Sequence, residues 1–228
     1  MALSSPPPTI VFDLDGTLID TAPDLIDTLN VVLGNEGLQP IPYATARALI
    51  GGGAKPMIAR GLEAEGRAAS PDTIDRMFED FIAYYANHIA DRSRPFPGLE
   101  AALDQLAARG FILAVCTNKI EKLAVQLLET LGLASRFAAI CGQDTFGMQK
   151  PDPAVLRRTI EAAGGSERRA VMVGDSETDI RTARVAGIAV IAVDFGYSEP
   201  PVAEFRPDRL ISNFAALAAA VTELLPAE

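Results

Sequence analysis

Short apolar runs recur along the chain and predict the strands of a buried sheet. The first covers residues 10–12, and later runs lie at 111–116, 138–141, 170–173 and 189–193. Runs of this length, rich in β-branched residues, are typical of strands that are covered on both faces. The segments between the later strands carry apolar residues at helical spacing, and several of them end at a glycine, where a left-handed helix cap is expected. The alternation of strand and helix predicts an α/β fold.

The stretch between the first strand and the second shows only helical periodicity. Thr21, with Asp24 three residues later, predicts that its first helix starts with a capping box. Right-handed crossovers would assemble the remaining segments into a mostly parallel sheet with helices on both faces. We therefore expect residues 1–16 and 95–228 to form a Rossmann-like core, and residues 17–94 to form a small all-helical cap domain inserted after the first strand.

Composition limits the classes of partner and the compartment. The chain has 228 residues, of which 49% are hydrophobic, so a folded core is expected and disorder is not. Its net charge of −10 argues against nucleic acid or an anionic membrane as a partner, because both bind basic surfaces. No basic segment followed by an apolar stretch opens the chain, and no apolar run approaches the length of a membrane span. We expect a cytoplasmic protein without a membrane segment, either a monomer or a homodimer.

Cysteine and histidine usage narrows the chemistry. Cys116 and Cys141 each end an apolar run and are interpreted as reduced core thiols, which agrees with a cytoplasmic compartment. The chain has a single histidine, His88, late in a predicted helix. A site with several histidine ligands is therefore excluded, and a Ser-His-Asp triad would have to recruit His88 from far along the chain.

Polar residues follow the predicted strands directly. Asp13 and Asp15 come after the first strand and, in an extended chain, point the same way. Two carboxylates held this close repel each other unless a cation or a proton compensates. Because open α/β sheets bind ligands beyond the carboxyl ends of their strands, the polar residues after the other strands belong to the same crevice. These are the segments Thr117-Asn118-Lys119 and 174–179, together with the loop lysine Lys150.

In this order, these residues resemble the four motifs of the haloacid dehalogenase superfamily, and in particular of its phosphatases. The match covers nearly the whole chain, and the helical insertion corresponds to the family's small cap. Segments 15–25 and 49–54 look like the phosphoglycolate phosphatase branch, although many of its members have Gly-Asn-Gly where this chain has three glycines, 51–53. The run from Asp13 to Thr17 matches the first motif, Thr117 the second, Lys150 the third, and Gly174-Asp175 with Asp179 the fourth.

The resemblance implies a Mg²⁺-dependent phosphatase for a small phosphorylated metabolite, with 2-phosphoglycolate as the first candidate. Asp13 would attack phosphorus and form an aspartyl phosphate, while Asp15 would protonate the leaving alkoxide and later deprotonate water. Mg²⁺ is a hard ion that prefers oxygen ligands, and it would offset the repulsion between two anions brought together. The residues assigned to the metal are Asp13, Asp15 through its main-chain carbonyl, Asp175 and Asp179.

Further residues are expected to bind the substrate. Hydroxyl, amide and ammonium groups at the sheet edge would hold the phosphoryl oxygens, and the lysine would also neutralise the nucleophile. These residues are Thr17, Thr117, Asn118 and Lys150. In the cap, glycines let backbone amides approach an anion closely, and a basic residue follows them on a helix. The cap residues expected to contact the substrate are Gly52 and Lys55.

Other interpretations stay open at this point. Thr117 is also a plausible helix N-cap, Ser176 with Asp179 matches a capping box, and glycines 51–53 could form only a turn. The same scaffold would serve a phosphatase or phosphomutase that acts on a sugar phosphate. A receiver-like signalling module also carries an aspartyl phosphate, but it leaves the helical insertion and Asp15 unexplained.

Overall fold

Six parallel strands form the central sheet. The computed structural model describes residues 6–68 and 70–225. Within them the strand order is β5-β4-β1-β6-β7-β8, and every neighbouring pair is parallel. The predicted parallel sheet is therefore confirmed, with β1 in its interior. The strands are β1 (Thr9–Phe12), β4 (Ile112–Cys116), β5 (Ala139–Cys141), β6 (Ala170–Gly174), β7 (Ala189–Val193) and β8 (Arg209–Ile211).

Strand β8 was not predicted from the hydrophobic pattern. It has three residues, and only Ile211 among them is buried, whereas Arg209 and Leu210 are exposed. It lies at the edge of the sheet, next to β7. An edge strand is covered less completely than an interior one, so it does not need the continuous apolar run by which the other strands were recognised.

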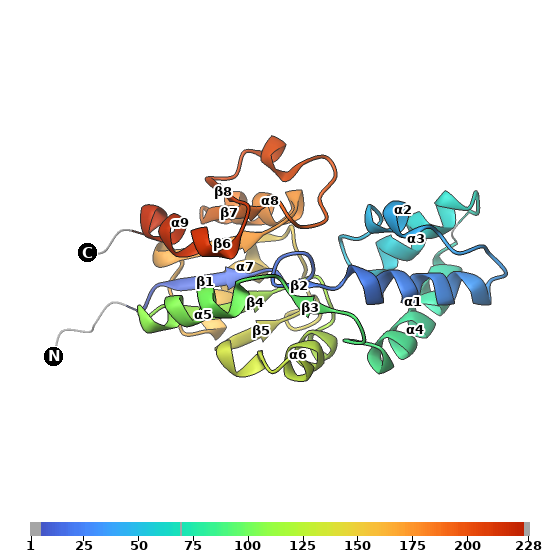
Figure 1. The fold of residues 1–228 in the computed structure, drawn as a ribbon, viewed down its shortest axis with the longest axis horizontal. Helices are drawn as coiled ribbons and strands as arrows, with labels where there is room; N and C mark the ends of the chain where they lie inside the picture. The colour runs from blue at the N-terminus through green and yellow to red at the C-terminus, as the bar shows by residue number, and fades with distance from the viewer. Residues whose placement is uncertain (1–5, 69, 226–228) are drawn as a thin grey trace.

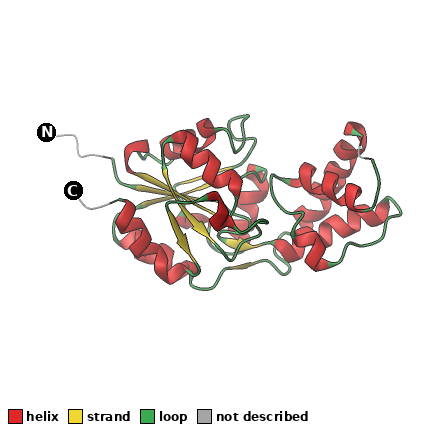
Figure 2. Ribbon diagram, turned by 90° about the horizontal axis from the view of Figure 1, so that it is seen from above, coloured by secondary structure: helices red, strands yellow, loops and turns green. Residues whose placement is uncertain are grey.

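Helices cover both faces of the sheet (Figure 2). Along β1, Ile10 and Phe12 belong to the core on one face and Val11 to the core on the other, as a period of two requires. The first face packs against α5 (Leu99–Ala108), α6 (Glu121–Thr130) and α9 (Leu217–Leu224), and the second against α7 (Pro153–Ala162) and α8 (Glu177–Ala186). Short 3-10 turns complete this part: η1 (Ala134–Arg136), η2 (Glu167–Arg169), η3 (Val202–Phe205) and η4 (Phe214–Ala216).

The cap, formed by helices α1 to α4, lies beyond the carboxyl end of the sheet (Figure 1). Apolar side chains such as Leu29, Met57 and Phe81 are buried where its helices pack together. Gly61 allows α3 to approach α1 closely, because a Cβ atom there would lie 3.2 Å from Leu29. The helices are α1 (Ala22–Asn35), α2 (Tyr43–Arg47), α3 (Ala54–Ala64) and α4 (Pro71–Asn87).

Two crossings of the chain join the cap to the sheet. Strands β2 (Ile19–Asp20) and β3 (Arg94–Pro95) pair antiparallel at this neck. This ladder was not predicted, and between its two strands the described residues of the insertion contain only the helices that the sequence predicts. A ladder of two residues on each side is too short to produce a recognisable alternation in the sequence. The domain boundaries at 16/17 and 94/95 stay a prediction.

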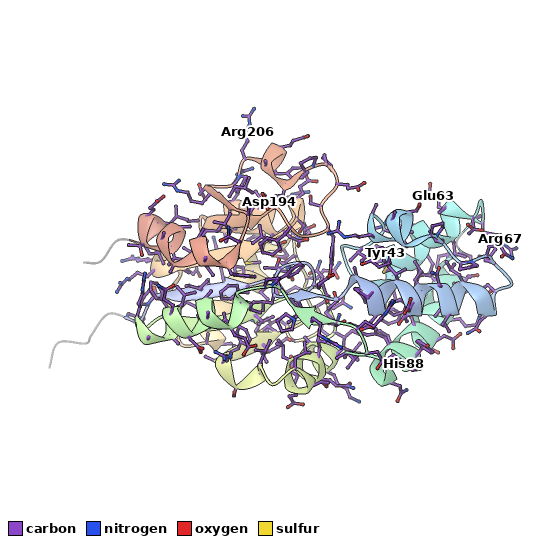
Figure 3. All side chains as sticks on the ribbon, viewed as in Figure 1. Tyr43, Glu63, Arg67, His88, Asp194 and Arg206 are labelled. Carbon is purple, nitrogen blue, oxygen red and sulfur yellow. The ribbon has the colours of Figure 1, made fainter. Side chains whose placement is uncertain are left out.

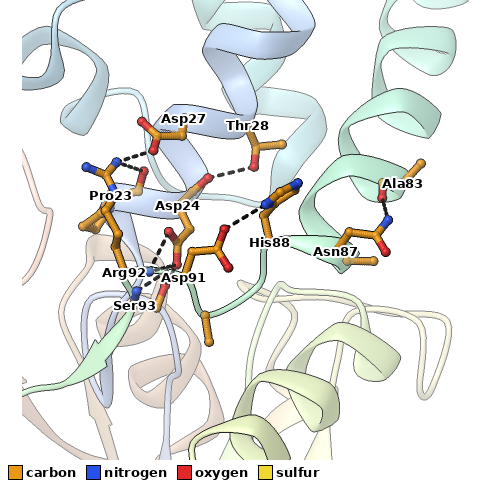
Figure 4. A network of polar contacts seen from close by, with 12 residues as sticks. Pro23, Asp24, Asp27, Thr28, Ala83, Asn87, His88, Asp91, Arg92 and Ser93 are labelled. Carbon is orange, nitrogen blue, oxygen red and sulfur yellow. Dashed lines mark hydrogen bonds and ion pairs between the residues drawn. The ribbon is translucent and has the colours of Figure 1, made fainter.

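The first cap helix begins where the sequence predicts, with Thr21 as its N-cap residue, but without the predicted capping box. Thr21 makes no side-chain capping bond, and its hydroxyl is buried without a partner among the described residues. The Asp24 carboxylate instead accepts hydrogen bonds from the backbone N–H groups of Arg92 (3.0 Å) and Ser93 (2.8 Å), and from the Ser93 hydroxyl (2.6 Å) (Figure 4). The capping box was wrong because residues far along the chain use Asp24 to tie the returning strand to α1.

Charged side chains occupy the outer surfaces of the cap and the core. Glu63 and Arg67 lie at the outer end of the cap, and Arg206 projects from the core (Figure 3). His88 follows α4 directly, and its Nδ1 lies 2.8 Å from the Asp91 carboxylate on the surface of the cap. None of the described helices has both the length and the apolar content that a membrane span requires.

Candidate active site

The candidate site is a cavity between the carboxyl edge of the sheet and the cap. Asp13 follows β1, Thr117 follows β4 and Asp175 follows β6, so three parallel strands bring these side chains to one edge. The Asp13 N–H continues the ladder beyond β1 by donating to the carbonyl of Val173 at 2.9 Å. The cavity has a volume of about 340 Å³, and its lining includes Asp13, Asp15, Thr117, Asn118, Lys150 and Asp175 from the core and Gly52, Met57, Arg60, Phe78 and Tyr85 from the cap.

Lys150 lies between two carboxylates, and one of them is Asp13, as the sequence predicts. Its Nζ atom is 2.8 Å from Asp13 Oδ1 and 2.6 Å from Asp179 Oδ1, and its side chain is 3% exposed. Burial opposes the charge of Lys150, but the two carboxylates more than offset that cost and raise its pKa. Burial also raises the pKa of Asp13 to about 6, against the opposing effect of Lys150. A fixed ammonium group therefore faces the predicted nucleophile.

Asn118 holds the loop that carries this lysine. Its side-chain amide donates to the Lys150 carbonyl at 2.9 Å and accepts from the Lys150 N–H at 2.9 Å. Thr117, two per cent exposed, accepts from the N–H of Lys119 at 3.2 Å. Helix α6 begins at Glu121, and Ile120 is its N-cap residue. The alternative of Thr117 as a helix N-cap is therefore wrong, and its hydroxyl stays beside the cavity.

Asp175 is buried and held in a tight backbone pocket. Its Oδ2 accepts from the Tyr197 N–H at 2.7 Å, and its Oδ1 from the Thr17 hydroxyl at 3.4 Å. A Cβ atom on Gly16 would lie 2.4 Å from Oδ2, and one on Gly196 would lie 2.2 Å from the Asp175 Cβ, so both positions require glycine. Burial raises the pKa of Asp175 to about 8, and the nearby Asp179 and Asp13 carboxylates add to the increase.

The carboxylate cluster is suited to a hard divalent cation. Asp13, Asp175 and Asp179 each offer an oxygen, and these three oxygens lie within 4.8 Å of one another. The raised pKa values of Asp13 and Asp175 indicate that negative charge is poorly compensated by the protein alone. Oxygen-only ligands at this spacing match the preference of Mg²⁺. The residues present therefore fit the predicted metal.

Asp179 has partners on both of its oxygens, and one of these partners is the buried Lys150. Its Oδ1 accepts a hydrogen bond from Lys150 Nζ, and its Oδ2 accepts from the N–H (3.1 Å) and the hydroxyl (2.6 Å) of Ser176. The capping box considered from the sequence is therefore present at the start of α8. Asp179 thus anchors Lys150 and the helix, and it is positioned beside the metal site.

Asp15 has its own lysine partner, Lys119, which the sequence places at the crevice but to which it assigns no role. Lys119 Nζ lies 2.8 Å from Asp15 Oδ1 and 3.0 Å from Oδ2, and it sits 4.6 Å from the centre of the Tyr85 ring of the cap. Burial opposes the charge of Lys119, but Asp15 more than offsets this and raises its pKa. Its place in the sequence was a usable signal for a site residue, because Lys119 comes directly after the two polar residues that follow strand β4.

The cap residues separate into two groups. Gly52 lines the cavity, and so does Arg60, whose guanidinium donates to the Gly51 carbonyl while its buried Nε has no partner among the described residues. Lys55 instead lies on the cap surface, with half of its side chain exposed. Its Nζ atom pairs with Asp75 at 2.5 Å. The structure therefore brings Gly52, and not Lys55, to the other site residues.

Two contributors to the site carry no sequence signal. Tyr197 comes from the loop after β7, and Arg47 comes from α2 and lies 5.0 Å from the centre of the Tyr197 ring. Neither belongs to a recognised motif or to an apolar periodicity. The fold of the loop after β7 places Tyr197 against Asp175, and the packing of the cap on the core places Arg47 against Tyr197.

Comparison with known proteins identifies the family. The model of the haloacid dehalogenase-like hydrolases matches residues 10–193. A phosphoglycolate phosphatase of Mesorhizobium japonicum is 49% identical over 218 residues, with 96% of each chain covered. One of Agrobacterium fabrum is 47% identical, covering 96% of this chain and 94% of its own.

A solved structure agrees with the sequence relatives. The crystal structure of a protein from Haemophilus somnus, described as a predicted phosphoglycolate phosphatase, superposes with a TM-score of 0.87 at 30% identity, covering 96% of this chain and 99% of that one. Its match extends over the cap as well as the sheet, and the Rossmann-like fold with flanking helices is shared. The chain belongs to the haloacid dehalogenase-like hydrolase family and is a phosphatase.

Proposed function

We propose that the protein is a Mg²⁺-dependent phosphatase that hydrolyses 2-phosphoglycolate to glycolate and phosphate through an aspartyl phosphate. The observation that carries the proposal is the pairing of each aspartate with its own lysine. Lys150 Nζ is 2.8 Å from Asp13, and Lys119 Nζ is 2.8 Å from Asp15. The names of the relatives at 49% and 47% identity support the same substrate.

The chemistry divides between the two aspartates. A carboxylate oxygen of Asp13 forms a bond to phosphorus as the ester oxygen departs, and Asp15 gives that oxygen its proton. In the second step, Asp15 takes a proton from water while the water oxygen bonds to phosphorus and the Asp13–phosphorus bond breaks. Lys150 neutralises charge on Asp13 and on the phosphoryl group in both steps.

The metal would be held by Asp13, Asp175 and the main-chain carbonyl of Asp15, with Asp179 beside them. When bound, Mg²⁺ supplies positive charge that offsets the repulsion between the phosphate and the carboxylates. Thr17 and Tyr197 fix the orientation of Asp175, since their hydroxyl and N–H groups bind its two oxygens. The hydroxyl of Thr117 lies at the same edge and would bind a phosphoryl oxygen.

The positive charge beside Asp15 favours a substrate whose leaving group carries a carboxylate. The alkoxide departs toward Asp15, and Lys119 is the cation beside that carboxylate. In 2-phosphoglycolate the leaving group carries its own carboxylate close to the ester oxygen, where it could pair with Lys119. A neutral sugar has no such group, so this arrangement favours phosphoglycolate over a sugar phosphate.

A panel of phosphate monoesters tests the proposal. The purified protein is assayed with 2-phosphoglycolate and with sugar phosphates, with Mg²⁺ and with a chelator. We expect Mg²⁺-dependent turnover with the highest kcat/KM for 2-phosphoglycolate, and phosphate trapped on Asp13 after rapid quenching. Asp13→Asn should remove both turnover and trapped phosphate. Full activity of this variant would exclude the covalent mechanism, and preferred turnover of sugar phosphates would exclude the substrate.

A further inference from the structure

The loop after β7 reaches the predicted metal site at one end and the neck of the cap at the other. Tyr197, on this loop, is buried, with 5% of its surface exposed. Its backbone N–H donates to Asp175 Oδ2 at 2.7 Å. Gly196 brings the loop this close, because any side chain there would collide with Asp175. The orientation of the Asp175 carboxylate therefore depends on where this loop lies.

The side chain of the same tyrosine binds the neck. Its hydroxyl oxygen accepts hydrogen bonds from the N–H groups of Thr21 at 2.7 Å and Ala22 at 2.9 Å, and it donates to Asp20 Oδ1 at 2.7 Å. These N–H groups open helix α1 and have no partner within the helix. Burial, with a further contribution from Asp20, raises the pKa of Tyr197, so the phenol keeps the proton that it donates. The Tyr197 hydroxyl thus makes the capping hydrogen bonds at the start of α1 that the Thr21 side chain does not make.

A second contact from the cap meets the same loop. The Arg47 guanidinium of α2 lies 5.0 Å from the centre of the Tyr197 ring and donates to the Gly196 carbonyl. Cap residues therefore hold the loop through both its backbone and its aromatic ring. Any rotation of the cap about the neck must either break these contacts, which releases the loop from the cap, or carry the loop with it, which moves the N–H group that binds Asp175.

We propose that Tyr197 is a positioning residue that couples the orientation of the cap to the metal-binding carboxylate of Asp175. The coupling rests on the proposed assignment of Asp175 to the metal. Because coupling between two sites is reciprocal, binding of Mg²⁺ orders the start of α1, and an ordered neck strengthens binding of Mg²⁺. Closing of the cap over a substrate and completion of the metal site are then one event.

Substitution Tyr197→Phe tests the coupling, because it removes the hydroxyl and keeps both the ring and the backbone N–H. Mg²⁺ alone is titrated by calorimetry, and amide hydrogen exchange is followed at Thr21 and Ala22 with and without Mg²⁺. In the wild type we expect Mg²⁺ to slow exchange at both amides. In Tyr197→Phe, which loses three hydrogen bonds, we expect neck exchange that no longer responds to the ion and an approximately tenfold weaker Kd for Mg²⁺, as coupling of the metal to about one of these bonds predicts.

Two further variants control the measurement. Asp20→Ala breaks the contact from the neck side while leaving Tyr197 intact, and it should change both readouts in the same direction. Tyr84→Phe removes a hydroxyl from a cap tyrosine that stacks on His88, with centroids 4.2 Å apart, and it should match the wild type.

The outcomes separate the coupling from the proposed metal site. If Tyr197→Phe exchanges faster at the neck but binds Mg²⁺ as the wild type does, the hydroxyl only caps the helix and the coupling is overturned. If the wild type binds no Mg²⁺ while Asp175 is intact, the metal assignment and the coupling both fail. Weaker Mg²⁺ binding in both Tyr197→Phe and Asp20→Ala, together with loss of the exchange response, supports the coupling.

Discussion

At the scale of single residues, two buried lysines give neighbouring aspartates different surroundings. Lys150 pairs with the carboxylates of Asp13 and Asp179, whereas Asp15 is the one carboxylate paired with Lys119 among the described residues. All of these side chains are less than one-fifth exposed, so their charges are weakly screened. Breaking such a pair leaves an uncompensated charge in the protein. Each lysine therefore has a function that a surface lysine would not have.

Substitution Lys119→Met should impair turnover of 2-phosphoglycolate most strongly. We expect kcat/KM for this substrate to fall by about 100-fold, because truncation of one partner of a buried charge pair costs about 2–5 kcal/mol. Ethyl phosphate, whose leaving group is neutral, should lose less. The ratio of the two kcat/KM values is the measurement, and Lys122→Met on the exposed side of α6 is the control. An unchanged ratio would show that Lys119 does not select the leaving group.

Glycine 196 is required by space and not by backbone conformation. Its φ lies outside the left-handed region, yet a Cβ atom would lie 2.2 Å from Asp175. Gly196→Ala should therefore lower the free energy of unfolding by about 1–3 kcal/mol, as overpacking does, and weaken Mg²⁺ binding. Gly34→Ala is the control, since Gly34 lies in α1 with open space around it and should gain about 0.5–1 kcal/mol. Denaturant unfolding measures both, and equal stabilities would contradict the predicted clash.

At the scale of elements, the start of α1 illustrates how a local signal can be overridden. The residues Thr21 and Asp24 have the spacing of a capping box, but Tyr197 caps the helix and Asp24 binds the returning chain at Arg92 and Ser93. A short-range capping bond competes with several long-range bonds that become available only when the neck closes. The tertiary contacts win because one carboxylate satisfies several otherwise unpaired donors.

Substitution Asp24→Ala should destabilise the protein much more than a change at the neighbouring surface aspartate. The buried Asp24 carboxylate accepts from two backbone N–H groups and a hydroxyl, so its loss should cost about 3 kcal/mol. Asp27 makes an exposed ion pair with Arg92, and Asp27→Ala should cost less than about 1 kcal/mol. Urea unfolding compares the two variants. Similar unfolding midpoints would show that the Asp24 network does not hold the neck.

At the scale of the whole molecule, the buried carboxylates of Asp13 and Asp175 are a source of instability that the proposed metal would relieve. Burial raises the pKa of Asp13 to about 6 and that of Asp175 to about 8, from an ordinary value of 3.8. Between about pH 4 and 8 the folded protein therefore holds more protons at these groups than the unfolded chain does. Their contribution to the free energy of unfolding is present at low pH and is lost as the pH rises through this range.

Mg²⁺ must displace these protons, so its binding should strengthen as the pH rises toward about 8. We expect Mg²⁺ to raise the Tm more at pH 8 than at pH 5, and to release protons on binding at pH values between. Scanning calorimetry gives the Tm, and titration calorimetry in buffers of different ionisation enthalpy counts the protons. Asp175→Ala should lose the Mg²⁺-induced shift at both pH values. A shift that is independent of pH in the wild type would contradict the linkage.

Most of the sheet and of the catalytic edge could be predicted from residue order. Strands that are buried on both faces must be apolar throughout, and polar residues that follow them directly must lie at one edge of a parallel sheet. That argument reached Asp13, Thr117 and Asp175, and the family motifs gave the loop lysine Lys150 its role. The edge strand β8 and the ladder at the neck were not predicted, because short and partly exposed strands leave no periodic pattern.

The sequence by itself determined the fold class and the set of side chains at the sheet edge, since burial and chain direction follow from local patterns. Only the tertiary structure decided the pairing of Asp15 with Lys119, the placement of Lys55 outside the cavity and the bridge that Tyr197 makes from Asp175 to the neck. These features depend on how strands, loops and helices pack together in the core, in the cap and between the two. Contacts between residues separated by more than a hundred positions have no periodicity along the chain, so they exist only once the fold has brought the two parts together.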